Sequence, residues 1–105
     1  MRAGELRHRV TIQQLVESQN EYGEIATTPQ TLAAVWGAVE DLSGREYFAA
    51  QQVSAEVSTR IRIRYRGGVV PKMQAVANGR TYDILAVLDP DGRRRELHLM
   101  CKAVV

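Results

Sequence analysis

Four arginines at alternate positions are the residues of this sequence whose types and spacing point most clearly to chemistry. They are Arg60, Arg62, Arg64 and Arg66. The residues between them, Ile61, Ile63 and Tyr65, are apolar, which is the pattern of a half-buried strand. Side chains two residues apart on a strand share a face at ~6.6 Å spacing, so the arginines form one row. Such a row suits an acidic surface on another subunit or DNA phosphates. The alternative is a solvated strand face.

The other reactive side chains form no recognisable catalytic or metal-binding group. His8 and His98 stand near opposite ends of the chain and would meet only if the first and last strands paired. Cys101 is the one cysteine and follows an apolar alternation, which is typical of a small core residue. The turn at 89–92 lacks the further ligands of a calcium loop. The sequence therefore predicts no enzyme, no cofactor and no metal.

The elements that position these residues are predicted to be short strands. Alternating apolar residues predict strands at 7–16, 31–40, 57–66, 74–77, 80–88 and 94–104. Asn78-Gly79 predicts a two-residue hairpin turn, and 89–92 predicts a type I turn. Short connections favour antiparallel neighbours. The predicted fold class is mainly β: a small antiparallel β-barrel or sandwich of about six strands, with one short helix between the second and third strands. Trp36, Tyr65 and Tyr82 fit core positions.

Two segments interrupt this pattern. Ser43 and Glu46 have the spacing of a capping box, which predicts a helix of about three turns within an excursion over 43–56. Its apolar face is thin, so the helix needs support from the sheet or from a neighbouring subunit. The polar stretch 17–30 is interpreted as a flexible loop or as the tip of a long hairpin.

Length and composition are those of one soluble globular domain spanning 1–105. The chain has 105 residues, of which 45% are hydrophobic and 25% charged, and its net charge is +2. One cysteine allows no intramolecular disulfide, which suits a reducing compartment. We expect neither a signal peptide nor a membrane span, because no apolar run has the required length.

Seven segments in order along the chain carry a resemblance to a known family. They are Leu6-Arg7-His8-Arg9-Val10-Thr11-Ile12, Tyr22-Gly23-Glu24, Val35-Trp36-Gly37-Ala38-Val39-Glu40, Ser43-Gly44-Arg45-Glu46, Arg60-Ile61-Arg62-Ile63-Arg64-Tyr65, Gly79-Arg80-Thr81-Tyr82-Asp83-Ile84 and Glu96-Leu97-His98-Leu99-Met100-Cys101-Lys102. Together they resemble the head–tail joining proteins of tailed bacteriophages, also called head-closure or stopper proteins. The segment 26–30 departs from the family pattern, since it has Thr-Thr-Pro where an aromatic residue is usual.

The resemblance implies a non-enzymatic structural protein of the phage or prophage neck. Such proteins form a ring between the portal or its adaptor and the tail, close the head, retain DNA and dock the tail. The implied partners are copies of itself in a ring formed on assembly, a portal or adaptor protein, and a tail or tail-terminator protein. A chain that is monomeric when alone is compatible with this resemblance. Packaged DNA would pass through the ring without being read by sequence, and no membrane is involved. The implied location is the virion neck, with assembly in the host bacterial cytoplasm.

This reading assigns three sets of contact residues. The arginine row would contact a subunit or DNA. The excursion would contact the channel or a neighbour through Arg45, Glu46, Tyr47, Gln51 and Gln52. The loop would dock through Asn20, Glu21, Tyr22 and Glu24. A ring subunit needs two different surfaces, and Glu40, Asp41 or Glu56 would supply the second.

Three alternative functions stay open at this point, and one of them is an enzyme with a catalytic group centred on His8 and His98, which requires the first and last strands to pair. A small-barrel nucleic-acid-binding module would also use the arginine row, although surface aromatics for stacking are few. A tail-completion protein is a near neighbour of the first reading. The run Arg93-Arg94-Arg95 is interpreted as a solvated hairpin end.

Overall fold

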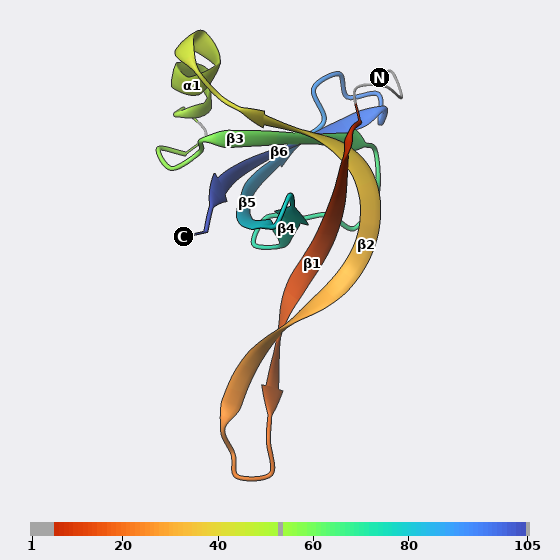
Figure 1. Ribbon diagram of the computed structural model, residues 1–105, viewed down its shortest axis with the longest axis vertical. Helices are drawn as coiled ribbons and strands as arrows, with labels where there is room; N and C mark the ends of the chain where they lie inside the picture. Colours follow the sequence, from red (N-terminus) through yellow and green to blue (C-terminus); the bar gives the residue numbers. More distant parts are fainter. Residues whose placement is uncertain (1–5, 53, 105) are drawn as a thin grey trace.

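Six antiparallel strands close into a barrel in the computed structural model, which describes residues 6–52 and 54–104. The elements are β1 (His8–Gln19), β2 (Ile25–Asp41), α1 (Gly44–Ala50), β3 (Thr59–Arg64), β4 (Gln74–Ala77), β5 (Arg80–Leu88) and β6 (Glu96–Ala103). Their order around the barrel is β1-β2-β3-β6-β5-β4, and β4 pairs with β1 to close the ring (Figure 1). This confirms the predicted mainly β class and the position of the helix between the second and third strands.

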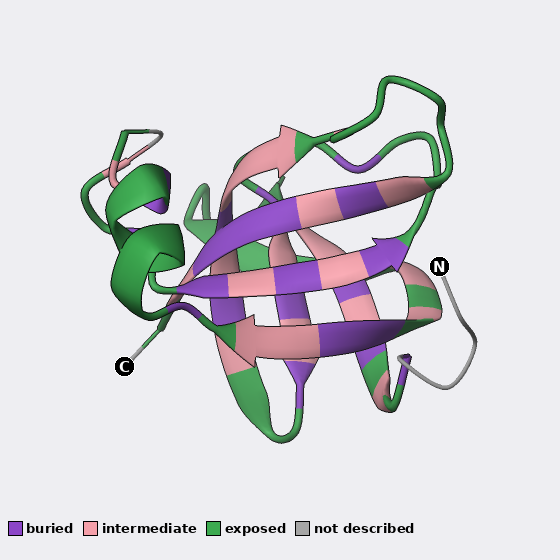
Figure 2. Ribbon diagram, turned by 90° about the horizontal axis from the view of Figure 1, so that it is seen from above, coloured by how far each residue is buried: buried purple, intermediate pink, exposed green. Residues whose placement is uncertain are grey.

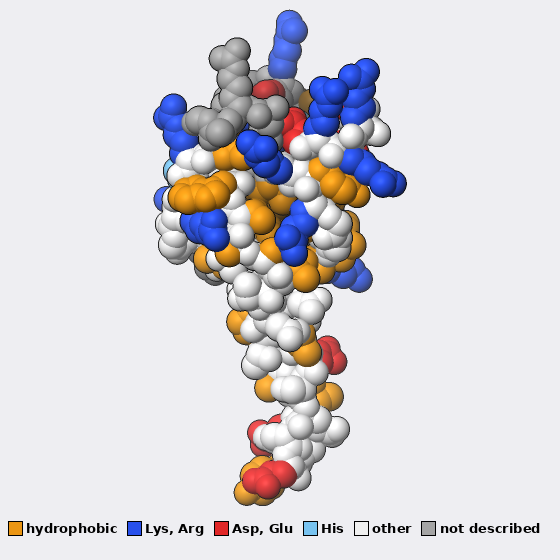
Figure 3. All heavy atoms as spheres, turned by 90° about the vertical axis from the view of Figure 1, so that its right-hand side faces the viewer, with side chains coloured by type: hydrophobic (Ala, Val, Ile, Leu, Met, Phe, Trp, Pro, Cys, Tyr) orange, Lys and Arg blue, Asp and Glu red, His pale blue; other side chains and the backbone are white. Residues whose placement is uncertain are grey.

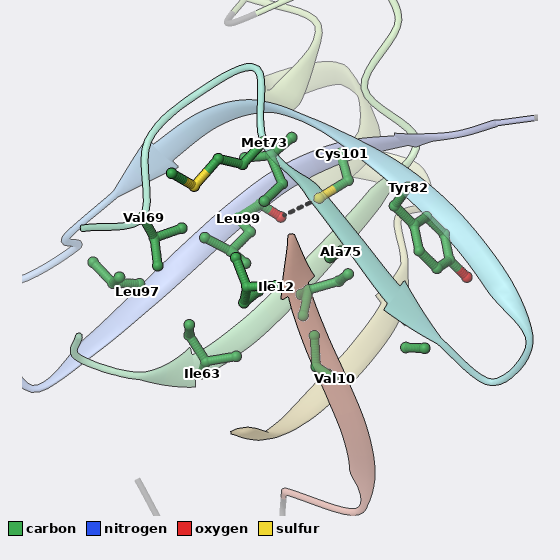
Figure 4. Packing of buried hydrophobic residues seen from close by; sticks show 13 residues of the cluster. Val10, Ile12, Ile63, Val69, Met73, Ala75, Tyr82, Leu97, Leu99 and Cys101 are labelled. Atoms are coloured by element: carbon green, nitrogen blue, oxygen red, sulfur yellow. Dashed lines mark hydrogen bonds between the residues drawn. The ribbon is translucent and has the colours of Figure 1, made fainter. Parts of the chain in front are cut away.

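The core fills the barrel with the inward-facing side chains of every strand. Ile61 and Ile63 of β3 are fully buried, and Leu97, Leu99 and Cys101 of β6 meet them, as the alternation predicted (Figure 4). A smaller buried cluster joins the helix to the barrel. It consists of Leu42, Ala50, Val57 and Met100. Burial of this apolar surface is the main favourable contribution to folding.

Two predicted turns are present. Asn78 and Gly79 have φ values of 54° and 74°, the left-handed conformations that a type I′ hairpin turn requires. In the turn at 89–92, the N–H of Gly92 donates to the carbonyl oxygen of Asp89 over 3.2 Å. Both turns form from local residues alone, and for that reason they could be predicted from the sequence.

Two of the three aromatic residues assigned to the core lie outside it. Tyr82 is buried at 3% exposure, but Trp36 is 54% exposed and Tyr65 is 40% exposed. Trp36 stands on the outer face of β2, opposite Arg9 in the register, and the Arg9 guanidinium lies 5.3 Å from the centre of its ring. This contact retains the aromatic side chain at the surface through a cation–π attraction. Tyr65 follows β3, which ends at Arg64.

The helix is shorter than predicted and has no side-chain cap. It spans seven residues, with Ser43 at the N-cap position but no capping hydrogen bond from its hydroxyl. The prediction of a capping box is wrong because the Glu46 carboxylate binds Arg60 of β3 instead, at 3.3 Å. The thin apolar face is confirmed, since Ala50 is the buried residue of the helix. Figure 2 shows the rest of α1 exposed beside the barrel. Val53 of the predicted excursion lies outside the described residues.

Beyond the barrel, β1 and β2 continue as a two-stranded arm, defined here as residues 14–30. Pairing of β1 with β4 ends at Gln13, next to a shift in the β1–β2 register between Ile12 and Gln13. From Gln14 and Gln30 outward, the two strands are paired with each other. Of the two interpretations of 17–30, the structure has the long hairpin, with strands over 17–19 and 25–30. Figure 1 shows the arm extending from the barrel, and the molecule measures 49 × 28 × 27 Å.

Candidate interaction site

Arg60, Arg62 and Arg64 of the arginine row lie on β3, whereas Arg66 follows it because β3 ends at Arg64, short of the predicted end at 66. The first half of the row is neutralised within the chain. Burial alternates along β3 as predicted, with Ile61 and Ile63 inside. Glu40 of β2 accepts from Arg60 Nε at 3.2 Å and from Arg62 Nε at 2.7 Å through the same carboxylate oxygen. Arg60 also binds Glu46 of α1. The structure thus joins two predicted sets of site residues, the row and the excursion, through Arg60.

Glu40 therefore lies within an ion-pair group of its own chain and not on a surface that faces a neighbouring subunit. The sequence reading offered Glu40, Asp41 or Glu56 as the surface facing a neighbour. Glu40 lies between two arginines of its own chain, and Glu56 pairs with Lys102 at 2.6 Å. Hydrogen bonding to Lys102 and its charge lower the pKa of the Glu56 carboxyl. These partners come from strands far apart in the sequence, so spacing along the chain gave no sign of them.

The second half of the row joins the basic run between β5 and β6. The N–H of Tyr65 donates to the carbonyl oxygen of Arg95 at 3.1 Å, which places the end of β3 beside the start of β6. The resulting group, called the arginine cluster here, consists of Arg64, Arg66, Arg93, Arg94 and Arg95, all exposed. Among the described residues, no carboxylate forms an ion pair with any of the five. Residues 93–95 are exposed between β5 and β6, as the prediction of a solvated hairpin end has it, and the position of the end of β3 beside them was not predicted.

Nearby carboxylates contribute little compensation to the arginine cluster. Asp89 accepts from the backbone N–H of Arg94 at 3.1 Å, so it shapes the turn. Glu96 lies 2.8 Å from the imidazole of His98 and is half-buried. Asp91 is exposed on the same turn. Because arginine remains charged at every accessible pH, the cluster keeps a net positive charge.

The predicted docking residues form the tip of the arm. The Asn20 side-chain oxygen accepts from the N–H groups of Tyr22 and Glu24, at 2.9 and 3.0 Å. Gly23 has a φ of 81°, a left-handed value that suits glycine in this turn. Glu21 and Tyr22 project outward, and Tyr22 is 81% exposed. The side chain of Asn20 therefore fixes the shape of the tip through local hydrogen bonds.

The predicted excursion residues lie on α1 and just after it, and Glu46 and Gln51 among them are bound within the chain. Arg45, Tyr47 and Gln52 are exposed, while Gln51 donates to the carbonyl oxygen of Val57 at 3.1 Å. Tyr47 and Phe48 meet edge to face, with ring centres 5.9 Å apart. Between α1 and the barrel lies a pocket of about 240 Å³. Its lining residues are Leu42, Glu46, Ala49, Ala50, Arg60, Leu88, His98 and Met100.

The structure does not bring the histidines together. His8 is on β1 and His98 on β6, and these strands are not neighbours in the barrel. Cys101 lies in the core, where burial and then the charge of Asp83 raise the pKa of its thiol to about 12. In the described ranges, no group of three potential ligands is placed to hold a metal ion. Nor does any helix there have the length and apolar character to cross a membrane.

The fold is a closed six-stranded β-barrel with a long arm, a short surface helix and an exposed arginine cluster. These features are surfaces for contact with other molecules, and they are typical of a protein that assembles with partners. The family comparison makes this class specific. The model of the phage head completion protein family matches residues 1–104, and the chain belongs to that family. The resemblance drawn from the seven sequence segments is thereby confirmed, and the protein is a structural component of the phage virion.

Solved structures share the fold. The solution structure of protein SF1141 from Shigella flexneri 2a is 30% identical, with a TM-score of 0.75, and the match covers 98% of this chain and 96% of that one. A chain from the virion of a native gene transfer agent particle is 18% identical, with a TM-score of 0.59, and 94% of each chain is covered. The curated proteins compared with the chain include no match.

Proposed function

We propose that this protein forms a ring at the neck of a phage or prophage particle, between the portal or adaptor and the tail. There it closes the head, retains the packaged DNA and docks the tail, after assembly in the host cytoplasm. The observation that carries the proposal is the match to the head completion family over residues 1–104. The shared fold with a chain of the gene transfer agent virion supports it.

The helix α1 supports a contact with a neighbouring component of the ring. Seven residues make a marginal helix, and α1 buries Ala50 while leaving Phe48 72% exposed. An exposed aromatic pair gains free energy when a partner covers it. We assign this contact to the exposed side of the helix. Its residues are Arg45, Tyr47 and Phe48 of α1 and Gln52 just after it, whereas Glu46 is bound to Arg60 and Gln51 to the Val57 carbonyl oxygen of the same chain.

The same barrel also fits a second candidate function, binding of DNA phosphates. The five arginines of the cluster have no carboxylate partner among the described residues, and guanidinium groups bind phosphate oxygens well. Such contacts would hold DNA without reading its sequence. This candidate predicts tight binding by the lone chain that weakens steeply with salt.

The test is the mass of the purified protein, alone and mixed with the portal complex encoded beside it, measured by light scattering on a sizing column. Elution as a ring with the portal complex is the expected result. Arg64→Glu combined with Arg66→Glu should weaken that association, because both side chains are exposed and neither has an ion-pair partner within residues 6–52 and 54–104. Arg62 is left intact in this test, since its bond to Glu40 belongs to the barrel itself.

Arg80→Glu is the matched control, because Arg80 is also exposed but lies at the β4–β5 turn. It should associate as the unchanged protein does. Absence of association with any portal or neck component, together with tight salt-sensitive DNA binding by the lone chain, would contradict the neck assignment. That result would favour the nucleic-acid-binding module instead.

A further inference from the structure

We propose that the acidic tip of the arm in one copy docks on the arginine cluster of the next copy. This inference deepens the proposed function, on which it rests, because it names the contact that would join subunits in the ring. It stands on three observations: the division of charge between arm and barrel, their positions along the molecule, and the chemistry of the two surfaces.

Charge divides sharply between the arm and the rest of the chain. No lysine or arginine occurs between Arg9 and Arg45, whereas Glu17, Glu21 and Glu24 all lie on the arm. The net charge of +2 therefore consists of −3 on residues 14–30 and +5 on the remainder. Figure 3 shows the acidic side chains on the lower arm and the basic ones over the barrel. Complementary potentials of this kind guide association and fix its orientation.

The two surfaces lie at opposite ends of one molecule. In Figure 1 the arm descends from the barrel, while the segment between β5 and β6, which carries Arg93–Arg95, lies at the top. The long axis of the molecule measures 49 Å. An arm therefore has no access to the arginine cluster of its own chain, and a second copy must supply it. A contact between unlike surfaces of identical subunits is heterologous, and it generates a ring when the rotation closes.

The side chains at the two ends match in chemistry as well as in charge. Glutamate carboxylates and guanidinium groups form short, charge-assisted hydrogen bonds, often in pairs. Tyr22 and Ile25 stand beside the glutamates, at 81% and 70% exposure. An exposed aromatic residue also lies in the cluster, since Tyr65 stands between Arg64 and Arg66 and is 40% exposed. A guanidinium group over the Tyr22 ring would add a cation–π attraction.

The arm tip is also ordered before any contact. Its turn is held by the two hydrogen bonds to Asn20, and the Asn20 amide donates to Glu24 at 3.2 Å. A surface that is already ordered loses less conformational entropy on binding. A second copy explains both charged ends at once. DNA would explain the arginine cluster alone and would be repelled by the glutamates.

The experiment is an exchange of charge between the two surfaces in the full chain. The arm variant carries Glu17→Lys and Glu21→Lys, which leaves the hydrogen bonds of the tip to Asn20 intact. The cluster variant carries Arg64→Glu, Arg93→Glu and Arg95→Glu, which change the charge of the five cluster positions from +5 to −1, while the arm variant changes that of the arm from −3 to +1. Mass is measured at low salt by light scattering, with each variant alone and with an equimolar mixture. We expect self-association about tenfold or more weaker in either variant alone. The mixture should recover assemblies, because each reversed surface then meets an opposite charge.

Arg80→Glu is again the control and should assemble as the unchanged protein does. A failure of the mixture to recover assembly would overturn the inference, as would an unchanged protein that stays monomeric at low salt. Normal assembly of the cluster variant, with loss of binding to duplex DNA of random sequence, would assign the cluster to phosphates. Because this test contains no portal component, its outcome is separate from that of the proposed function. A ring that forms on the portal complex without recovery in the mixture would contradict only the arm contact.

Discussion

Gly37 lies on β2 between the paired strands β1 and β3, opposite His8 and Ile63, and a side chain at this position has no room. A Cβ at this position would stand 2.9 Å from Val10 Cγ2, 3.0 Å from the Arg62 carbonyl oxygen and 3.0 Å from Ile63 Cγ2. We expect Gly37→Ala to lower the free energy of unfolding by about 1–3 kcal/mol, since the neighbours include backbone and a packed core. Chemical denaturation measures the change. Gly67→Ala is the matched control, because nothing lies within 4 Å of the added atom.

Cys101 should be chemically silent in the folded protein. Burial raises the pKa of its thiol to about 12 from a usual value of 9.0, and its Sγ donates to the Leu99 carbonyl oxygen at 3.3 Å. The thiolate, which is the reactive form, is then scarce at neutral pH. We expect thiol reagents to modify the protein only after denaturant unfolds it. Because the folded pKa is raised, stability should also fall as pH rises from about 9 toward 12. Rapid labelling of the native protein at neutral pH would contradict this account.

For single residues, the sequence predicted burial correctly where the alternation within one strand determines it. Cys101, Ile61 and Ile63 are buried as their alternation indicated, because a strand in a barrel has one inward face. Trp36 was misplaced because its hydrophobicity favoured the core, whereas Arg9 on the neighbouring strand holds it outside. Such a cross-strand contact depends on register, which the spacing of one strand does not determine.

Glu40 connects three elements, since it bonds to Arg60 and Arg62 of β3, and Arg60 reaches Glu46 of α1. Glu40→Gln keeps the shape of the side chain but removes its charge from these two half-buried arginines. We expect a loss of about 1–3 kcal/mol in the free energy of unfolding, typical of a hydrogen bond to a charged group. Glu56→Gln is the comparison, because the pair with Lys102 is exposed and should matter little. Equal effects of the two substitutions in a denaturant titration would contradict the connecting role of Glu40.

The arm should be dispensable for folding. Its residues from Leu15 to Gln30 are exposed, and β4 pairs with β1 only as far as Gln13. Replacing residues 15–29 by Asn-Gly joins Gln14 to Gln30 through a favoured hairpin turn. The free energy of unfolding should change by less than about 1 kcal/mol, since little apolar surface is lost and the connection becomes shorter. Cooperative thermal unfolding at a much lower temperature than that of the full chain would disprove this independence.

Elements defined by local signals were predicted well, and elements defined by distant partners were not. The Asn78-Gly79 hairpin was recognised because the dipeptide itself favours the left-handed turn. The arm was left open between loop and hairpin because 17–30 is polar on both faces and shows no alternation. The three-turn helix was an overestimate, since its expected cap is lost to the long-range pair of Glu46 with Arg60.

The overall dimensions provide a test of the whole molecule in solution. The Cα radius of gyration is 14.7 Å, larger than the ~13 Å expected of a compact chain of this length. The arm accounts for the difference, because the other two dimensions of the molecule are 28 and 27 Å. Small-angle X-ray scattering of the monomer should give an elongated profile. Removal of residues 15–29 should bring the radius of gyration close to the compact value. An identical radius for both proteins would show that the arm folds back on the barrel.

In the described part of the chain, each barrel strand has a paired strand on both sides over part of its length, whereas the two strands of the arm pair only with each other. Along the arm, the backbone N–H and C=O groups on the outer side of each strand face solvent, and such edges can recruit another strand and begin aggregation. Pro29 lacks an N–H to offer, and Glu17 of β1 and Glu24, just before β2, give the arm like charges that oppose the pairing of two arms. These residues act as gatekeepers. The strand edges of the arm can therefore bind a specific partner without pairing edge to edge with further copies into an aggregate.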